Sequence, residues 1–128
     1  MENNLLVTVV DDDESVRESL PDLLREFGYA VETFASAEEF LASGRVANTA
    51  CLILDIAMPG MSGPDLQREL AQRRENVPIV FMTAHADPSV FPRLIEQGAA
   101  ACLLKPFSDT ALRDALDAAL DGHSPNEG

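Results

Sequence analysis

Basic residues are scarce in this sequence. Only 9 of its 128 residues are Lys or Arg, against 22 Asp and Glu, so the formal net charge is −13 with the 2 His neutral. A surface of this sign repels the phosphate backbone of nucleic acids and anionic bilayers. We therefore expect no direct binding of nucleic acid by this chain, although it could still control a separate DNA-binding domain.

Long hydrophobic runs, a Gly-rich phosphate loop and paired cysteines are also missing. The longest apolar runs, such as residues 5–10 and 79–82, are far shorter than the ~20 residues that cross a bilayer, so no membrane segment is expected. The first residues carry no export signal, which predicts a cytoplasmic location. No Gly-rich loop follows the first apolar run, which argues against nucleotide binding. The 2 cysteines, Cys51 and Cys102, lie inside apolar runs and are predicted to be reduced, buried thiols.

The sequence instead alternates short apolar runs with longer amphipathic stretches. Four runs are almost entirely apolar, as expected of strands covered on both faces: residues 5–10, 51–54, 78–82 and 101–104. A fifth run, residues 30–34, is interrupted by Glu32, which suits a strand at the edge of a sheet. Helical patterns follow the runs, and four residues are predicted N-caps: Ser36, Ser62, Asp87 and Ser108.

Strand and helix therefore follow each other five times along the chain. This order predicts an α/β domain with a doubly wound, five-stranded parallel sheet and helices on both faces. We expect residues 1–121 to form this single domain, and residues 122–128 to be a polar tail or the start of a linker.

Polar side chains stand at the point where each buried run ends. Asp11, Asp12 and Asp13 follow residues 5–10, and Asp55 follows residues 51–54. Thr83 follows residues 78–82, and Lys105 follows residues 101–104. The carboxyl ends of parallel strands share one edge of the sheet, where open sheets bind their ligands. One spot should therefore collect several carboxylates, a hydroxyl and an ammonium group.

Converging carboxylates need a cation. Two unit charges about 4 Å apart repel by roughly 4 kcal/mol at an effective dielectric constant near 20. Oxygen ligands without His or Cys favour Mg²⁺ over zinc, and Lys105 supplies a second positive charge. Asp55 stands alone before a turn, so it is the candidate nucleophile for a phosphoryl group, with Thr83 and Lys105 in position to contact the phosphoryl oxygens.

Together these residues resemble the receiver domain of bacterial two-component response regulators. The likeness covers residues 5 to about 120 and rests on four features in order: the acidic cluster, Asp55 with Met58-Pro59-Gly60-Met61-Ser62-Gly63, Thr83-Ala84, and Lys105-Pro106-Phe107. The phrases Ser36-Ala-Glu-Glu-Phe-Leu and Thr83-Ala-His-Ala-Asp are most similar to receivers that precede a helix-turn-helix domain, including the nitrogen-fixation regulators. The resemblance implies a flavodoxin-like (βα)5 fold with strand order 2-1-3-4-5.

The resemblance also implies a set of roles. Asp55 would accept a phosphoryl group from a phosphohistidine of a sensor histidine kinase. Asp12 would bind Mg²⁺ directly, Asp11 mainly through water, and the backbone carbonyl of Ala57 would complete the protein ligands. Thr83 would move toward the phosphoryl oxygens and Lys105 would pair with them. These roles define a self-catalysed switch rather than an enzyme.

Further expectations concern the surroundings of these residues. By resemblance, the bond before Pro106 is cis, and a homodimer forms on phosphorylation through the fourth helix, the fifth strand and the fifth helix. Asp13 is expected to cap the first helix instead of joining the cluster. Pro92 indicates that the fourth helix begins late or is loosened near its start.

Cys102 departs from the family pattern, and other functions stay open. Receivers usually carry Tyr or Phe three residues before the lysine, where this chain has Cys102. The signal would then pass through backbone shifts or another side chain such as Phe107.

A phosphatase with an aspartyl-phosphate intermediate needs a second acid two residues after its nucleophile, and Ala57 at that position argues against this class. The remaining alternatives are a constitutive interaction scaffold and the receiver of a hybrid kinase.

Overall fold

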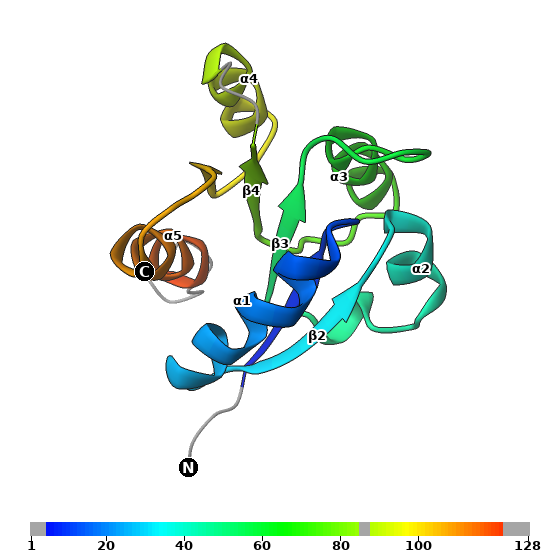
Figure 1. The fold of residues 1–128 in the computed structure, drawn as a ribbon. Coiled ribbons are helices and arrows are strands. Elements are labelled where there is room, and N and C mark those ends of the chain that lie inside the picture. Colours follow the sequence, from blue (N-terminus) through cyan, green and yellow to red (C-terminus); the bar gives the residue numbers. More distant parts are fainter. Residues whose placement is uncertain (1–4, 85–87, 122–128) are drawn as a thin grey trace.

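The computed structural model describes residues 5–84 and 88–121, which form one parallel sheet flanked by helices (Figure 1). Its strands, in the spatial order β2-β1-β3-β4-β5, are β2 (Ala30–Phe34), β1 (Leu6–Val10), β3 (Cys51–Asp55), β4 (Ile79–Thr83) and β5 (Ala101–Leu104). The helices are α1 (Glu14–Glu26), α2 (Ala37–Ala42), α3 (Gly63–Gln72), α4 (Phe91–Glu96) and α5 (Asp109–Asp121), with 3-10 turns η1 (Val46–Asn48) and η2 (Pro88–Val90). The predicted α/β fold and strand order are confirmed.

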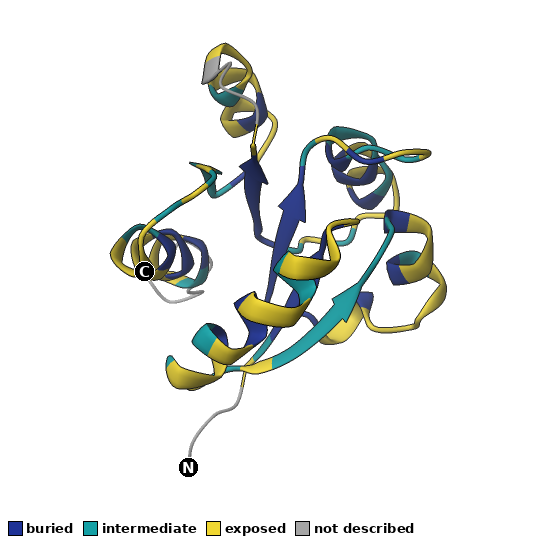
Figure 2. Cartoon of the chain, viewed as in Figure 1, coloured by how far each residue is buried: buried dark blue, intermediate teal, exposed yellow. Residues whose placement is uncertain are grey.

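Each face of the sheet has its own apolar layer. One layer packs β1, β3 and β4 against α1 and α5, and the other packs the opposite face of the same strands against α2, α3 and α4. The side chains of β3 alternate between them, because Ile53 points into the first layer and Leu54 into the second. Since both faces are covered, the middle strands are buried along their length, as Figure 2 shows for β3 and β4.

β2 lies at the edge, as its interrupted pattern predicts. Its residues are exposed or half-buried, whereas all of β3 is buried. Glu32 forms an ion pair with Arg45 at 3.3 Å, so the charge that breaks the apolar run stays at the rim of the sheet. Such charged edges also discourage pairing with a strand of another chain.

Side-chain caps fix where the helices begin. The Asp13 carboxylate accepts the Ser15 N–H at 3.0 Å and so caps α1, as predicted. Ser36, Ser62 and Ser108 likewise accept a backbone N–H in the first turns of α2, α3 and α5. These four predicted caps are formed, so the loops that carry the polar residues end at defined positions. The predicted cap Asp87 lies outside the described residues.

α4 begins late, which confirms the expectation from Pro92. The α-helix spans Phe91–Glu96, with Pro92 in its first turn and η2 before it. No side chain caps its start, since Val90 is the N-cap residue. The helix is therefore a short element that follows β4 and η2 and precedes β5 in the chain.

The two cysteines differ in burial. Cys51 lies fully inside the sheet, and burial raises the pKa of its thiol to about 12. Cys102 is only half-buried, because β5 is the other edge strand of the sheet, and burial raises the pKa of its thiol to about 11. Both thiols are free, so the prediction of reduced cysteines holds, but full burial is wrong for Cys102.

Gly63 allows α3 to start directly against the end of β3. Its N–H donates to the carbonyl of Ile56 at 3.0 Å. A Cβ at this position would clash with the carbonyl oxygen of Asp55 and would lie 3.0 Å from the ring of Phe81. We expect Gly63→Ala to lower the free energy of unfolding by about 1–3 kcal/mol despite the better helix propensity of Ala. Urea denaturation checks this, and unchanged stability would show that α3 is not seated on β3.

Within the described residues, no helix combines the length and the hydropathy needed to cross a bilayer.

Candidate phosphoacceptor and magnesium site

The polar residues that follow the strands meet at one edge of the sheet. They surround a cavity of about 180 Å³, which is lined by Asp11, Asp12, Asp13, Asp55, Ala57, Thr83, Ala84 and Lys105. The strand register explains the convergence, because Val10 pairs with Leu54 and Asp55 with Met82, so neighbouring strands among β1, β3 and β4 end within one residue of each other. All six site residues predicted from the sequence therefore line one cavity.

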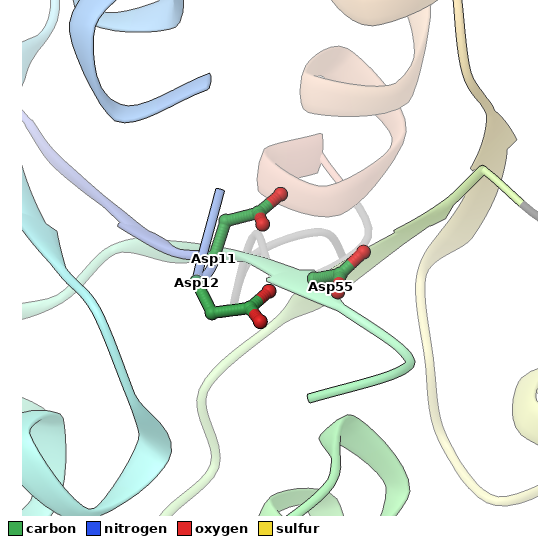
Figure 3. A group of neighbouring side chains, drawn as sticks. All are labelled: Asp11, Asp12 and Asp55. Carbon is green, nitrogen blue, oxygen red and sulfur yellow. The ribbon is translucent and has the colours of Figure 1, made fainter. Parts of the chain in front are cut away.

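Three carboxylates form the centre of the site (Figure 3). Asp11, Asp12 and Asp55 each offer an oxygen atom, and these atoms all lie within 4.8 Å of one another. Asp11 is fully buried and Asp55 nearly so, whereas Asp12 is exposed. Burial and the charge of Asp11 raise the pKa of Asp55 to about 6, although Lys105 acts in the opposite direction. Ionisation of Asp55 at this site is therefore costly, as the sequence predicted for converging carboxylates.

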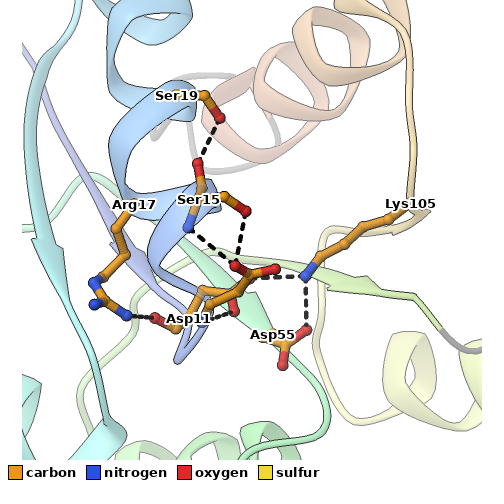
Figure 4. A network of polar contacts seen from close by, with 7 residues as sticks. Asp11, Ser15, Arg17, Ser19, Asp55 and Lys105 are labelled. Atoms are coloured by element: carbon orange, nitrogen blue, oxygen red, sulfur yellow. Dashed lines mark hydrogen bonds and ion pairs between the residues drawn. The ribbon is translucent and has the colours of Figure 1, made fainter.

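Lys105 bridges two of these carboxylates. Its Nζ atom lies 2.8 Å from Oδ2 of Asp11 and 3.3 Å from Oδ1 of Asp55 (Figure 4). Partial burial acts to lower the pKa of Lys105, but its hydrogen bond to Asp11 and the charges of both carboxylates raise it on balance. The ammonium group is therefore charged and points into the site. The Lys105–Pro106 bond is cis, as the resemblance implied.

Hydrogen bonds fix both the backbone and the side chain of Asp11. Its N–H donates to the carbonyl of Phe34 at 3.1 Å, its Oδ1 accepts the N–H of Asp13 at 2.9 Å, and its Oδ2 accepts from Lys105. Asp12, in contrast, presents an exposed carboxylate to the cavity. The two adjacent acids therefore differ: Asp11 is a fixed part of the frame, and Asp12 has an open face for a ligand.

Asp13 lines the cavity but does not belong to the group of three carboxylates. The side chain of Ser15 donates to its carboxylate at 2.8 Å, and this bond together with the backbone N–H of Ser15 holds the pKa of Asp13 below its usual value. Asp13 therefore caps α1, which agrees with the sequence prediction.

The loops after β3 and β4 complete the walls. Ala57 is exposed in the loop that follows Asp55, and Thr83 is buried at the last position of β4. Glu38 of α2 accepts the N–H of Met61 at 3.0 Å, which ties the first of these loops to α2. Sequence reasoning missed Glu38 because this contact joins residues 23 positions apart. The acidic residues in the first turn of α2 are the sequence feature that could have suggested a role for Glu38.

The donor set fits Mg²⁺. The described residues that line the cavity offer carboxylate, carbonyl and hydroxyl oxygens, and none of them is His or Cys. Mg²⁺ is a hard cation that binds a few carboxylates and keeps several waters, whereas zinc prefers nitrogen and sulfur. The arrangement can therefore hold Mg²⁺ beside Asp55 and leave room for a phosphoryl group.

Mg²⁺ should stabilise the folded protein. At about 100 times its dissociation constant, a ligand that binds only the folded state adds about 2.7 kcal/mol to the free energy of unfolding. We expect this gain in the native sequence and a much smaller one in Asp12→Asn. Asp13→Asn is the matched control, because Asn also caps helices and the charge removed lies beside the site. Thermal unfolding with and without Mg²⁺ checks this, and an equal gain in all three proteins would contradict it.

Comparison with known proteins identifies the family. The response regulator receiver domain matches residues 7–117, and the chain belongs to this family. It is 45% identical over 116 residues to Nodulation protein W of Bradyrhizobium diazoefficiens, covering 91% of this chain and 51% of that protein. It is 41% identical over 128 residues to the transcriptional regulatory protein FixJ of Azorhizobium caulinodans, covering 100% of this chain and 60% of that protein.

Solved structures give the same result. The response regulator StyR is 48% identical with a TM-score of 0.84, covering 91% of this chain and 59% of that one. FixJ-N is 35% identical with a TM-score of 0.84, covering 96% of this chain and 98% of that one. Receiver domains of this family are phosphorylation switches of two-component systems, interact with sensor histidine kinases and typically bind Mg²⁺ at an acidic pocket. The chain spans only about half to three fifths of the length of these curated relatives.

Proposed function

We propose that Asp55 is the phosphoacceptor of this receiver domain. The observation that carries the proposal is the carboxylate of Asp55 at the end of β3, 3.3 Å from the Lys105 ammonium and within 4.8 Å of two further carboxylates. A carboxylate oxygen of Asp55 attacks the phosphorus of a phosphohistidine, the P–N bond breaks, and the imidazole leaves with the electron pair. Water later hydrolyses the acyl phosphate and releases inorganic phosphate.

The side chains around Asp55 support this step. With a pKa of about 6, the Asp55 carboxylate is mostly ionised above neutral pH and can act as the nucleophile. Lys105 already contacts Asp55 and supplies positive charge for the phosphoryl oxygens, and the Thr83 hydroxyl lines the same cavity. Bound Mg²⁺ would neutralise further negative charge on the phosphoryl group.

Three groups of the chain are proposed to hold Mg²⁺ besides Asp55. Asp12 is the direct ligand, because its carboxylate is exposed to the cavity. Asp11 acts mainly through water, because both of its oxygens already accept hydrogen bonds, from Asp13 and from Lys105. The backbone carbonyl of Ala57 is the remaining protein ligand, since Ala57 lines the same cavity.

Phosphorylation is proposed to change the face formed by α4, β5 and α5. Thr83 stands at the end of β4, directly before the segment that leads to η2 and the short helix α4. Three large apolar residues of these elements and of the adjoining η2 are exposed by about two fifths of their surface: Val90 of η2, Ile95 of α4 and Leu104 of β5. We propose that these residues are covered when two phosphorylated copies form a homodimer, with Cys102 in the place of the usual aromatic ring.

The effector that this receiver controls is proposed to lie outside the described residues. The relatives include transcriptional regulators, and this chain covers about half to three fifths of their length. We propose residues 1–121 as the receiver unit, controlling transcription through another domain or partner. The tail, residues 122–128, lies outside the described residues.

Intact mass spectrometry tests this function. The protein is incubated with Mg²⁺ and acetyl phosphate, and we expect a gain of one phosphoryl group that is absent in Asp55→Asn and strongly reduced without Mg²⁺. Size-exclusion chromatography of the same samples should show a dimer only after phosphorylation, and Ile95→Asp should accept phosphate but remain a monomer. A protein that gains no phosphate, or gains it in Asp55→Asn, would refute the assignment.

A further inference from the structure

Arg17 reaches back from α1 to the acidic loop. It is the fourth residue of the helix and is half-buried. Its Nη1 atom donates a hydrogen bond of 2.9 Å to the backbone carbonyl of Asp11 (Figure 4). Among the described residues, no carboxylate forms an ion pair with Arg17. The guanidinium group therefore binds a neutral backbone carbonyl and not a carboxylate.

This carbonyl belongs to the peptide group that joins Asp11 to Asp12. A peptide group is planar, so a donor that fixes the carbonyl also fixes the N–H and the Cα atom of Asp12. The other groups of Asp11 are fixed by Phe34, Asp13 and Lys105. The Arg17 bond is therefore the contact that sets the orientation of the next residue, Asp12, whose exposed carboxylate has no such frame of its own.

We propose that Arg17 is a positioning residue, which holds the Asp11 carbonyl so that the Asp12 carboxylate faces the cation site. This inference rests on the proposed function, because it assumes that Asp12 binds Mg²⁺. Residues that orient metal ligands without touching the metal typically change metal affinity by 10- to 100-fold when they are replaced.

The positive charge of Arg17, taken alone, predicts the opposite change in Mg²⁺ affinity when Arg17 is replaced. A guanidinium close to an acidic site repels a second cation, so removing it by charge alone would strengthen Mg²⁺ binding. Loss of the hydrogen bond frees the peptide group and weakens Mg²⁺ binding. The direction of the change in Mg²⁺ affinity therefore separates a positioning role from an electrostatic one.

Arg17→Met is the test variant. Met keeps an unbranched apolar stem and a good helix propensity but has no donor. Arg17→Gln is the second variant, since its amide is too short to reach the carbonyl in the same backbone geometry. Arg25→Ala is the matched control: it removes the same charge from the other end of α1, where Arg25 is exposed and contacts Asp22 at 3.5 Å.

Isothermal titration of each protein with MgCl₂, without any phosphoryl donor, gives the result. We expect Arg17→Met and Arg17→Gln to bind Mg²⁺ roughly tenfold more weakly, and Arg25→Ala to bind it like the native protein. The amide ¹⁵N resonance of Asp12 should also shift in the metal-free Arg17 variants, as a freed preceding carbonyl requires.

The outcomes separate the two proposals. If the native protein binds Mg²⁺ and the folded Arg17 variants bind it equally or more tightly, Arg17 does not position Asp12. If the native protein itself binds no Mg²⁺, the proposed function fails. An unshifted Asp12 resonance in the Arg17 variants would overturn the positioning role independently of any affinity.

Discussion

Asp55→Asn is expected to raise the free energy of unfolding of the metal-free protein by about 2–3 kcal/mol at neutral pH and above. The reason is the pKa of Asp55, which burial and the Asp11 carboxylate raise from 3.8 to about 6. A carboxylate that is harder to ionise in the folded state than in the unfolded chain destabilises the fold at every pH where it is charged. Asn removes this cost and keeps the shape of the side chain.

The gain has a defined pH dependence. Because the folded pKa lies above the unfolded one, the native protein is relieved of the cost below about pH 4 and bears it fully above about pH 6. The difference between Asp55→Asn and the native protein should therefore be small at pH 4, grow between pH 4 and 6, and stay constant above. Urea denaturation across this range, in the presence of a chelator, measures it.

Asp114→Asn is the control for this experiment. It removes a carboxylate of α5 that is exposed, so its effect on stability should stay within about 0.5 kcal/mol at all pH values. Asn at position 55 also gives up the 3.3 Å contact with Lys105, but Lys105 keeps its shorter bond to Asp11. An Asp55→Asn protein that is less stable than the native one at pH 7 would contradict the account of a strained acidic site.

Lys105→Met is expected to lower the rate of phosphoryl transfer by 10²- to 10³-fold, the usual loss when one donor to the transferred group is removed. Among the described residues, Lys105 is the basic residue that forms an ion pair with Asp55, and it lines the cavity beside Thr83. Without it, the charge on the phosphoryl oxygens loses its partner from the protein. The rate is measured by intact mass at several times of incubation with acetyl phosphate and Mg²⁺.

The same variant should bind Mg²⁺ more tightly than the native protein. Removing the ammonium group takes away a positive charge that competes for Asp11 and Asp55, so the carboxylates attract a divalent cation more strongly. Slower transfer together with tighter Mg²⁺ binding is a combination that simple unfolding does not produce. Lys105→Arg keeps the charge and should lose less of the rate. Equal rates in Lys105→Met and the native protein would exclude the proposed role.

Much of the fold could be predicted because its signals are local. The break at Glu32 marks the edge strand, Asp13 caps α1, and Pro92 delays the start of α4. The position of the site follows from one further rule, that parallel strands end at the same edge. Since Asp55 and Thr83 each follow a buried run, the sequence already places both of them at that edge.

The contacts that hold the site together could not be predicted in the same way. Arg17 and Glu38 bind backbone groups of other loops, and a sequence pattern does not specify which carbonyl or N–H a flexible side chain meets. The half-burial of Cys102 depends on how much of the edge strand β5 is left open by α4, a property of packing and not of composition. The sequence also did not indicate that Lys105 lies closer to Asp11 than to Asp55.

The most direct test of the account is the position of the phosphoryl group. Borohydride reduces an acyl phosphate of aspartate to homoserine, so the protein is incubated with Mg²⁺ and acetyl phosphate, reduced, digested and analysed by tandem mass spectrometry. The account predicts homoserine at position 55, formed only when Mg²⁺ and the phosphoryl donor are both present. Homoserine at position 11 or 12 instead, or none at all in protein that has gained a phosphoryl group, would contradict it.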